Sequence, residues 1–408
     1  NGPALYAAGD FLTAGGNPAS RIARWDGSGW SALGSGLNAR VESLIVFDDG
    51  NGAALYAGGG FTIAGDGPAS HVARWDGSDW SPLGGGVNSN VHALAVHDDG
   101  GGAALFAGGS FTTAGNEPAA YIGRWDGAGW SAVGGGVNFS VRDLVVHDDG
   151  NGVALYAGGS FTTAGGNPAN RVARWDGAGW SALGGGTDDR VEALLAFDDG
   201  SGPALYAGGW FTTAGDEPAK YIARWDGNDW AALGTGMDSV VRVVAVHDDG
   251  SGPALYAGGR FTTAGGVNVS RIARWDGSGW SPLGSGVNGQ VWAMAFFDDG
   301  SGPALHVGGW FTTAGDQPVN YIARWDGSSW SAVGGGLGRE EDAAVYALTV
   351  FNDGRGDALY AGGGFTTAGG VPARNIARWD GRSWSGLGGG VDEQVFALTV
   401  FDAGSGPA

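Results

Sequence analysis

Short apolar runs alternate with Gly- and Asp-rich turns along the whole chain, at a spacing of 50 residues. Residues 154–186, ALYAGGSFTTAGGNPANRVARWDGAGWSALGGG, are one copy of the pattern. Such a period predicts an array of similar supersecondary units. Four extra residues break it once, near residues 338–344. The predicted eight repeats span about residues 1–50, 51–100, 101–150, 151–200, 201–250, 251–300, 301–354 and 355–408.

Each repeat predicts four strands, called A to D here. In one copy, residues 91–97 (VHALAVH) and 104–111 (ALFAGGSF) are apolar runs of strand length, joined by the turn signal DDGGG. Residues 121–126 (YIGRWD) and 130–133 (WSAV) predict strands C and D. A side chain at the Gly pair of strand B would block a close backbone approach. Gly and β-branched residues interrupt every helical pattern, so we expect a four-stranded antiparallel meander.

The repeat resembles the kelch repeat, on the run Ala-Leu-Tyr-Ala before Gly58 and Gly59, followed by Trp75 and Trp80. The two Trp residues are closer together than the aromatic pair of most kelch units. The Trp-Asp-Gly turn is also similar to the Asp-box of sialidase propellers, and the Asp-Asp-Gly turn is distantly similar to the calcium hairpins of integrin-type propellers. The resemblance implies an all-β, eight-bladed β-propeller with four-stranded antiparallel blades. It implies no active site.

The ends of the chain support ring closure. The sequence opens in a strand B and finishes with a strand A at residues 395–401, which can complete the first blade. An open solenoid is the alternative, although its ends would need polar caps. Because all eight repeats are alike and no linker interrupts them, we predict a single domain over residues 1–408.

Composition narrows the function. Gly accounts for 85 residues, but it recurs beside apolar residues that amount to 43% of the chain, unlike a flexible linker. The net charge of −21 excludes a basic nucleic-acid face. No apolar run approaches the ~18 residues of a membrane span. Without cysteine there are no disulfides or thiolate chemistry. We expect a monomeric, exported bacterial protein, extracellular or at the cell surface.

Residues that recur in every repeat are interpreted as structural. The Trp pairs serve as wedges between blades, and one Arg per strand C pairs with the Asp-Asp turn. His97, His147 and His247 replace an apolar residue and are interpreted as packing positions. Turn capping accounts for the paired aspartates, and weak Ca²⁺ binding is the alternative; no other cofactor is expected. The candidate calcium ligands are Asp48, Asp49, Asp98, Asp99, Asp148 and Asp149.

Three positions of the repeat hold different residues from one copy to the next. All three are expected on the face that is formed by the B–C and D–A loops. The residue after the Gly pair is Asp10, Gly60, Ser110, Ser160, Trp210, Arg260, Trp310 or Gly364. The first residue of strand C is Arg21, His71, Tyr121, Arg171, Tyr221, Arg271, Tyr321 or Asn375. The second residue of strand A is Glu42, His92, Arg142, Glu192, Arg242, Trp292, Tyr346 or Phe396.

Exposed Trp, Tyr and Arg on a rigid scaffold are typical of binding surfaces, whereas drift at unconstrained positions is the alternative. Consecutive predicted blades carry Trp210, Arg260, Trp292 and Trp310, a grouping that drift does not favour. The candidate ligand-binding residues are Trp210, Arg260, Trp292, Trp310, Tyr221, Tyr321 and Tyr121.

The sequence predicts a non-catalytic binding or scaffold module that recognises a glycan or a protein through the B–C/D–A loop face. A structural cell-surface or stalk module and a propeller-fold carbohydrate-active enzyme are the alternatives. No Ser/His/Asp arrangement stands out, because the acids recur in every repeat. The cysteine–tyrosine cross-link of kelch-type galactose oxidases is excluded, because the chain has no cysteine. A catalytic residue should break the symmetry of the repeats.

Overall fold

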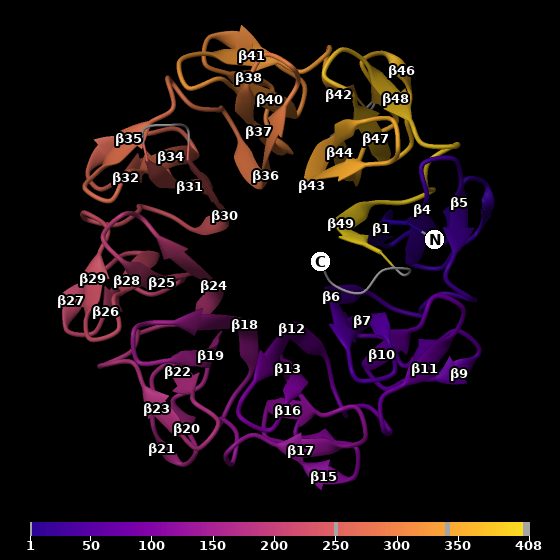
Figure 1. Cartoon of the computed structure of the whole chain (residues 1–408). Coiled ribbons are helices and arrows are strands. Elements are labelled where there is room, and N and C mark those ends of the chain that lie inside the picture. Colours follow the sequence, from indigo (N-terminus) through magenta and orange to yellow (C-terminus); the bar gives the residue numbers. More distant parts are fainter. Residues whose placement is uncertain (1, 249–251, 339–342, 403–408) are drawn as a thin grey trace. The chain divides into compact units, whose positions relative to one another are not determined.

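The computed structural model describes residues 2–248, 252–338 and 343–402, and in these ranges it contains strands and turns but no helix (Figure 1). The described residues contain eight four-stranded antiparallel sheets. The insertion at residues 339–342 and the turn at 249–251 lie outside the described residues. The chain divides into two compact units, unit 1 (Asn1–Gly36 and Met237–Gly404) and unit 2 (Leu37–Gly236). The prediction of a single domain stays a prediction.

Four sheets belong to each unit, and each sheet is given from strand A to strand D. Those of unit 1 are β49 (Val395–Phe401), β1 (Ala4–Gly9), β4 (Ile22–Trp25), β5 (Trp30–Ala32); β30 (Val241–Asp248), β31 (Pro253–Gly259), β34 (Ile272–Trp275), β35 (Trp280–Pro282); β36 (Gln290–Asp298), β37 (Pro303–Trp310), β40 (Ile322–Trp325), β41 (Trp330–Ala332); and β43 (Ala344–Asn352), β44 (Asp357–Gly364), β47 (Ile376–Trp379), β48 (Trp384–Gly386).

The sheets of unit 2 follow one another along the chain without interruption. They are β6 (Val41–Asp48), β7 (Ala53–Gly59), β10 (Val72–Trp75), β11 (Trp80–Pro82); β12 (Val91–Asp98), β13 (Ala103–Gly109), β16 (Ile122–Trp125), β17 (Trp130–Ala132); β18 (Val141–Asp148), β19 (Val153–Gly159), β22 (Val172–Trp175), β23 (Trp180–Ala182); and β24 (Val191–Asp198), β25 (Pro203–Gly209), β28 (Ile222–Trp225), β29 (Trp230–Ala232).

The B–C connection of every repeat contains a small hairpin that the sequence pattern did not predict, because each of its strands has two residues. The hairpins are β2 (Thr13–Ala14) with β3 (Asn17–Pro18), β8 (Ile63–Ala64) with β9 (Gly67–Pro68), β14 (Thr113–Ala114) with β15 (Glu117–Pro118), β20 (Thr163–Ala164) with β21 (Asn167–Pro168), β26 (Thr213–Ala214) with β27 (Glu217–Pro218), β32 (Thr263–Ala264) with β33 (Val267–Asn268), β38 (Thr313–Ala314) with β39 (Gln317–Pro318), and β45 (Thr367–Ala368) with β46 (Val371–Pro372), which β42 (Leu337–Gly338) joins.

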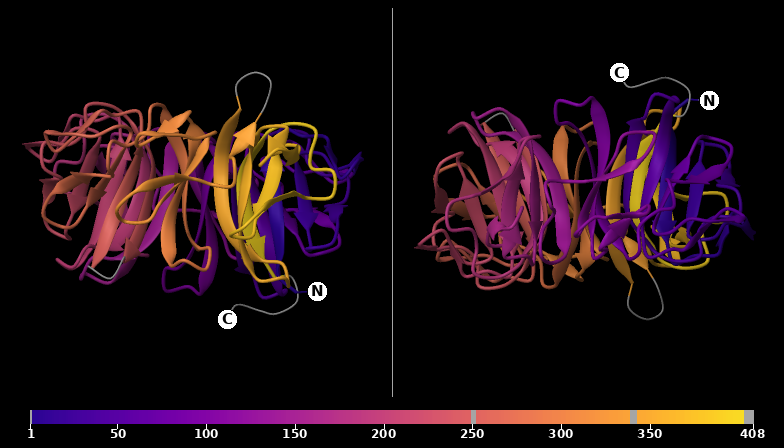
Figure 2. Two further views of the ribbon diagram at one scale, coloured as in Figure 1. Left: turned by 90° about the horizontal axis from the view of Figure 1, so that it is seen from above. Right: turned by 90° about the horizontal axis from the view of Figure 1, so that it is seen from below.

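The first and last strands of the chain pair in one sheet. β49 runs antiparallel to β1, with Ala4 opposite Phe401 and Ala8 opposite Ala397. The yellow β49 accordingly lies beside the indigo β1 in Figure 1 and in both views of Figure 2. An open solenoid would leave these strands in separate sheets, so that alternative is excluded. The predicted all-β fold class is confirmed, with eight four-stranded sheets in the described residues and the closing pair that an eight-bladed propeller requires.

The four residues of strand B before the Gly pair are buried in every repeat, and the Gly pair allows neighbouring backbones to approach. A Cβ on Gly58 would lie 2.6 Å from Val91 of the next sheet, and a Cβ on Gly59 would lie 2.2 Å from the carbonyl oxygen of Arg40. Either contact is shorter than a van der Waals separation. The Gly pair therefore allows the close approach that the sequence predicted.

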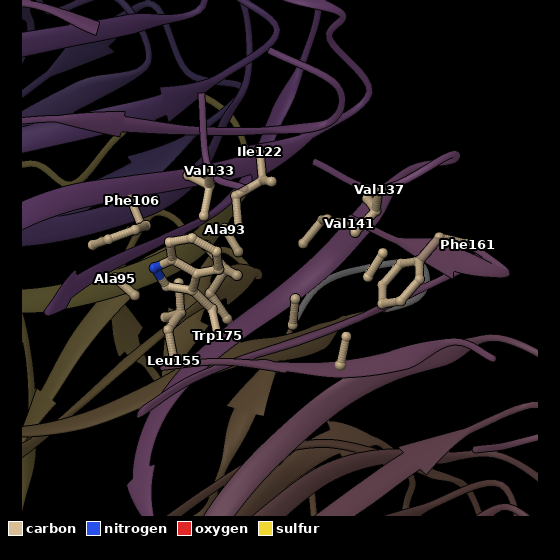
Figure 3. Close-up of a cluster of buried hydrophobic side chains, with 14 of the residues drawn as sticks. Ala93, Ala95, Phe106, Ile122, Val133, Val137, Val141, Leu155, Phe161 and Trp175 are labelled. Atoms are coloured by element: carbon tan, nitrogen blue, oxygen red, sulfur yellow. The ribbon is translucent and has the colours of Figure 1, made fainter. Parts of the chain in front are cut away.

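Within each unit, the first Trp of a pair fills the space between consecutive sheets. Trp175 lies among Ala95, Val133 and Leu155, which come from two neighbouring sheets of unit 2 (Figure 3). Its ring lies 5.5 Å from that of Trp180, the second Trp of the pair. This confirms the interpretation of the Trp pairs as wedges between blades.

Candidate functional site

The residue before each strand C has a left-handed backbone, although none of the eight is glycine. Their φ angles lie between 61° and 67°. This conformation costs roughly 1–2 kcal/mol per residue that carries a Cβ. At Tyr321 two backbone hydrogen bonds maintain it, from its own N–H to Phe311 (3.0 Å) and from the Gly309 N–H to its carbonyl (3.1 Å). A fixed backbone therefore presents the variable side chain at this position.

Trp310 and Tyr321, both predicted as ligand-binding residues, line one hollow in unit 1. Its volume is about 260 Å³. Trp310 follows the Gly pair of strand β37 and is 47% exposed. Trp310 ends β37 and Tyr321 directly precedes β40 of the same sheet, so the B–C connection between them brings the two side chains together. The residues that line this hollow, called the Trp310 hollow below, are Asn288, Gly289, Trp310, Phe311, Thr312 and Tyr321.

The wall of the Trp310 hollow is rigid. The side-chain oxygen of Asn288 accepts the N–H groups of Thr312 (2.8 Å) and Thr313 (3.0 Å), while its amide nitrogen donates to the Thr312 hydroxyl (3.0 Å). A Cβ on Gly289 would lie 1.9 Å from the carbonyl oxygen of Trp310, so only glycine fits there. In another repeat Phe139 occupies the position of Gly289. The hollow is thus preformed, and no side chain of residue 289 enters it.

The equivalent tryptophan in unit 2, Trp210, is already partnered. The guanidinium of Arg190 lies 4.8 Å from the centre of its ring, and Arg190 also forms an ion pair with Glu192 at 2.7 Å. Trp210 is still 43% exposed. One face of its ring is therefore covered by a cation of the same chain.

The other candidates do not join the Trp310 hollow. In unit 2, Tyr121 lies 6.0 Å from the exposed ring of Phe139, and Tyr221 is half-buried. In unit 1, Arg260 is exposed, while Trp292 stacks on Tyr346 at 5.0 Å, so that one face of the Trp292 ring is occupied. The ligand-binding role of these residues stays a prediction.

The Asp-Asp turns are built as turn caps. Asp48 accepts the N–H groups of Gly50 (2.9 Å) and Gly52 (3.0 Å), and Asp98 and Asp148 do the same in their turns. The second aspartate of each turn pairs with the strand C arginine, as predicted. These pairs are Arg74 with Asp49 (3.7 Å), Arg124 with Asp99 (3.2 Å) and Arg174 with Asp149 (4.0 Å).

Calcium binding at these turns stays a prediction. Across residues 2–248, 252–338 and 343–402, no three His, Cys, Asp or Glu side chains lie close enough to share a metal ion. Hard cations need six to eight oxygen ligands, so each turn on its own offers too few for tight binding.

The histidines at the end of strand A pack against aromatic rings. His97 lies 6.0 Å from Phe106, and His147 lies 5.8 Å from Tyr156. Burial lowers the pKa of both histidines, despite the opposing effect of the aspartates that follow them. These neutral rings fill packing positions, as the sequence predicted.

His306 is a singular residue that the sequence analysis missed. It replaces the aromatic residue of the strand B motif, as Ala-Leu-His-Val in place of Ala-Leu-Tyr-Ala, and this break in the repeat was its only signal. The side chain is fully buried, and burial lowers its pKa to about 4. In other repeats the tyrosine hydroxyl donates to the second turn aspartate, as Tyr206 does to Asp199 (2.7 Å) and Tyr360 to Asp353 (2.8 Å).

In unit 2 a serine, a histidine and a carboxylate are connected by hydrogen bonds, although the sequence analysis singled out no such arrangement. His92 Nδ1 lies 2.7 Å from a carboxylate oxygen of Glu42, and His92 Nε2 lies 2.9 Å from the hydroxyl of Ser110. All three belong to the variable positions, and they come from two neighbouring sheets. The sequence analysis named all three among the variable positions, but their spacing along the chain did not show that they meet.

No family model matches the chain, and no curated protein matches it. Solved structures similar to it include the extracellular domains of a putative one-component system from B. thetaiotaomicron (12% identity, TM-score 0.39) and of a putative hybrid two-component system from the same organism (11%, 0.42). An ancestral GH74 enzyme is also similar (14%, 0.44).

The aligned part covers 94% of this chain in all three comparisons, but only 52%, 52% and 60% of the other chains. At these identities and TM-scores the likenesses carry no argument about function, and the kelch assignment stays a prediction. Within the described ranges, no helix has the length and apolar character needed to cross a membrane.

Proposed function

We propose that the protein is a ligand-binding module, exported by a bacterium, that recognises a neutral glycan through the Trp310 hollow. The observation that carries the proposal is the pairing of an exposed indole with Tyr321 in a preformed hollow. Sugar rings present apolar C–H faces that pack on aromatic rings, and their hydroxyl groups bond to nearby polar groups. Thr312 and the Tyr321 hydroxyl supply such groups at the hollow.

Charge favours a neutral ligand over an acidic peptide. None of the six residues that line the hollow is charged. The chain as a whole carries a net charge of −21, which disfavours the approach of anions. A glycan without acidic groups therefore fits the site better than an acidic glycan or peptide.

Rigidity favours binding as well. Asn288 fixes the loop of Thr312 through three hydrogen bonds, and the left-handed backbone of Tyr321 fixes where its side chain begins. A preorganised site loses little conformational entropy when a ligand binds.

Isothermal titration with neutral hexasaccharides of glucose, mannose and galactose, and with a galacturonate hexamer as the acidic comparison, tests the proposal. Trp310→Ala should weaken binding of the preferred neutral sugar by about 1–3 kcal/mol. Trp210→Ala should have a smaller effect, because Arg190 already covers one face of its ring. Preference for the acidic hexamer, or an effect of Trp210→Ala equal to that of Trp310→Ala, contradicts the assignment. Binding of a protein and of none of the sugars would favour the protein-ligand alternative.

A further inference from the structure

We infer that Ser110, His92 and Glu42 in unit 2 form a nucleophilic serine site that hydrolyses carboxylic esters of small acyl groups. This activity is independent of the proposed glycan binding, which concerns other residues in unit 1.

The geometry assigns a role to each nitrogen of the His92 ring. Nδ1, 2.7 Å from a Glu42 oxygen, carries the proton that it donates to the carboxylate. The lone pair of Nε2, 2.9 Å from Ser110, then accepts the hydroxyl proton of the serine. This is the order of contacts by which a carboxylate orients a histidine and the histidine activates a serine.

The backbone places these side chains through a bulge at the start of β12. Val91 pairs with Gly109 and Ala93 with Gly108, so His92 is the extra residue. A bulge redirects a side chain out of the regular alternation of the strand. The N–H of Ser110 donates to the carbonyl of Asn90 at 2.9 Å, which fixes the serine beside this bulge.

Glu42 is oriented and remains ionised. It occupies the equivalent position of the neighbouring strand β6, which packs beside β12. The amide nitrogen of Asn90 donates to its other oxygen at 3.4 Å. The hydrogen bond from His92 is the main cause that holds the pKa of Glu42 below its ordinary value. A carboxylate in this state stabilises the imidazolium that forms during acyl transfer.

The reaction needs only an ester and water. Ser110 Oγ attacks the acyl carbon while His92 Nε2 takes its proton, and the C–O bond to the alcohol breaks as His92 returns that proton to the leaving oxygen. Water then attacks the acyl-serine, giving its proton to His92, and the serine leaves with that proton. The products are a carboxylic acid and an alcohol. The hydroxyl of Ser110 is half-buried beside a His92 side chain that is only 11% exposed, which suits small acyl groups.

The test uses a fluorophosphonate probe and p-nitrophenyl acetate on the whole chain. The serine oxygen should displace fluoride from the probe, and peptide mass spectrometry should place the label on Ser110. Ser110→Ala and His92→Gln should each lower kcat/KM for the acetate ester at least about 100-fold. Glu42→Gln, which acts through His92, should lower kcat at least about 10-fold with KM unchanged.

Ser160→Ala is the matched control, because Ser160 occupies the same position in the next repeat but Arg142 replaces the histidine there. It should leave labelling and hydrolysis unchanged. If the three contacts only tie the two sheets together, the parent protein will not be labelled at Ser110. That result overturns the inference even if the variants do not fold, and so does a Ser110→Ala protein that hydrolyses the ester as fast as the parent.

Discussion

Trp130 donates its indole N–H to the carbonyl oxygen of Leu83, 2.7 Å away in the preceding sheet. The same bond recurs in other repeats, as from Trp180 to Val133 (2.8 Å) and from Trp330 to Leu283 (2.6 Å). The first Trp of the same pair, Trp125, has no partner for its indole nitrogen in the described part of the chain. In the pair of Trp125 and Trp130, one tryptophan therefore stabilises the interface by a hydrogen bond and the other by packing alone.

Phenylalanine substitutions separate these contributions. Trp130→Phe removes the indole hydrogen bond, although the Leu83 carbonyl keeps the N–H of Gly86 at 2.7 Å, whereas Trp125→Phe removes no hydrogen bond. We expect Trp130→Phe to lower the free energy of unfolding by about 1 kcal/mol more than Trp125→Phe does. Urea unfolding of both variants measures the difference, and equal losses would show that the indole hydrogen bond adds nothing.

Truncation of a buried tryptophan should be far more costly. Trp25 is only 4% exposed and packs in the core between the first and last sheets of unit 1. Trp25→Ala should lower the free energy of unfolding by about 3–5 kcal/mol, because it leaves a cavity. Trp310→Ala is the comparison, since its exposed ring contributes little to folding. Calorimetry that shows equal drops in melting temperature for both would contradict this division into structural and ligand-binding tryptophans.

His306 makes stability depend on pH. Its folded pKa of about 4 lies below the ordinary value of 6.5, so the unfolded chain binds the proton more readily between these values. The free energy of unfolding should therefore fall as the pH drops from about 6.5 to about 4, by about 3 kcal/mol from this residue. The charged groups that act on His306 are Asp299 and Arg324.

His306→Tyr provides the measurement. The variant should lose this part of the pH dependence while keeping that of His97 and His147, and its tyrosine can donate to Asp299 as Tyr206 does to Asp199. Urea unfolding of both proteins at pH 7 and pH 4 gives the contribution as a difference. If the free energy of unfolding falls by the same amount in both proteins between pH 7 and pH 4, His306 is not the group responsible.

Calcium should bind weakly if it binds at all. In the turn of Asp48 and Asp49, the first carboxylate caps two amides and the second faces an arginine. We expect millimolar calcium to raise the melting temperature by about 1–2 °C relative to chelator. An unchanged melting temperature removes the calcium prediction, and a rise of ten degrees would mean a tighter site than these turns provide.

The sequence predicted the repeated parts of the fold well, because each strand and turn is encoded locally and appears eight times. Residues 91–97 were predicted as strand A, and the structure extends that strand to Asp98. The left-handed backbone before strand C had no consistent local signal, since six of the eight residues there are Arg or Tyr, which do not favour it. The sequence showed correctly at which positions the repeats differ. It did not show which of the side chains at these positions lie close together.

Two pairs of variable residues come together only in the folded chain. Trp310 and Tyr321 share a hollow because the B–C connection folds back on its own sheet, with Gly289 leaving the space open. His92 contacts Glu42 only because β12 packs beside β6 of the neighbouring sheet, with the two residues at equivalent positions of their strands. Neither distance follows from spacing along the chain, so the sequence could supply the residues but not the sites.

The central claim is that ligand recognition lies at the loop end of the sheet that carries Trp310. A crystal structure of the protein with the neutral hexasaccharide that it binds most tightly tests this directly. The account predicts a sugar ring against the indole of Trp310, with hydroxyl groups near Tyr321 and Thr312. Sugar density at the Asp-Asp turns, or at the loop end of another sheet with the Trp310 hollow empty, would contradict it.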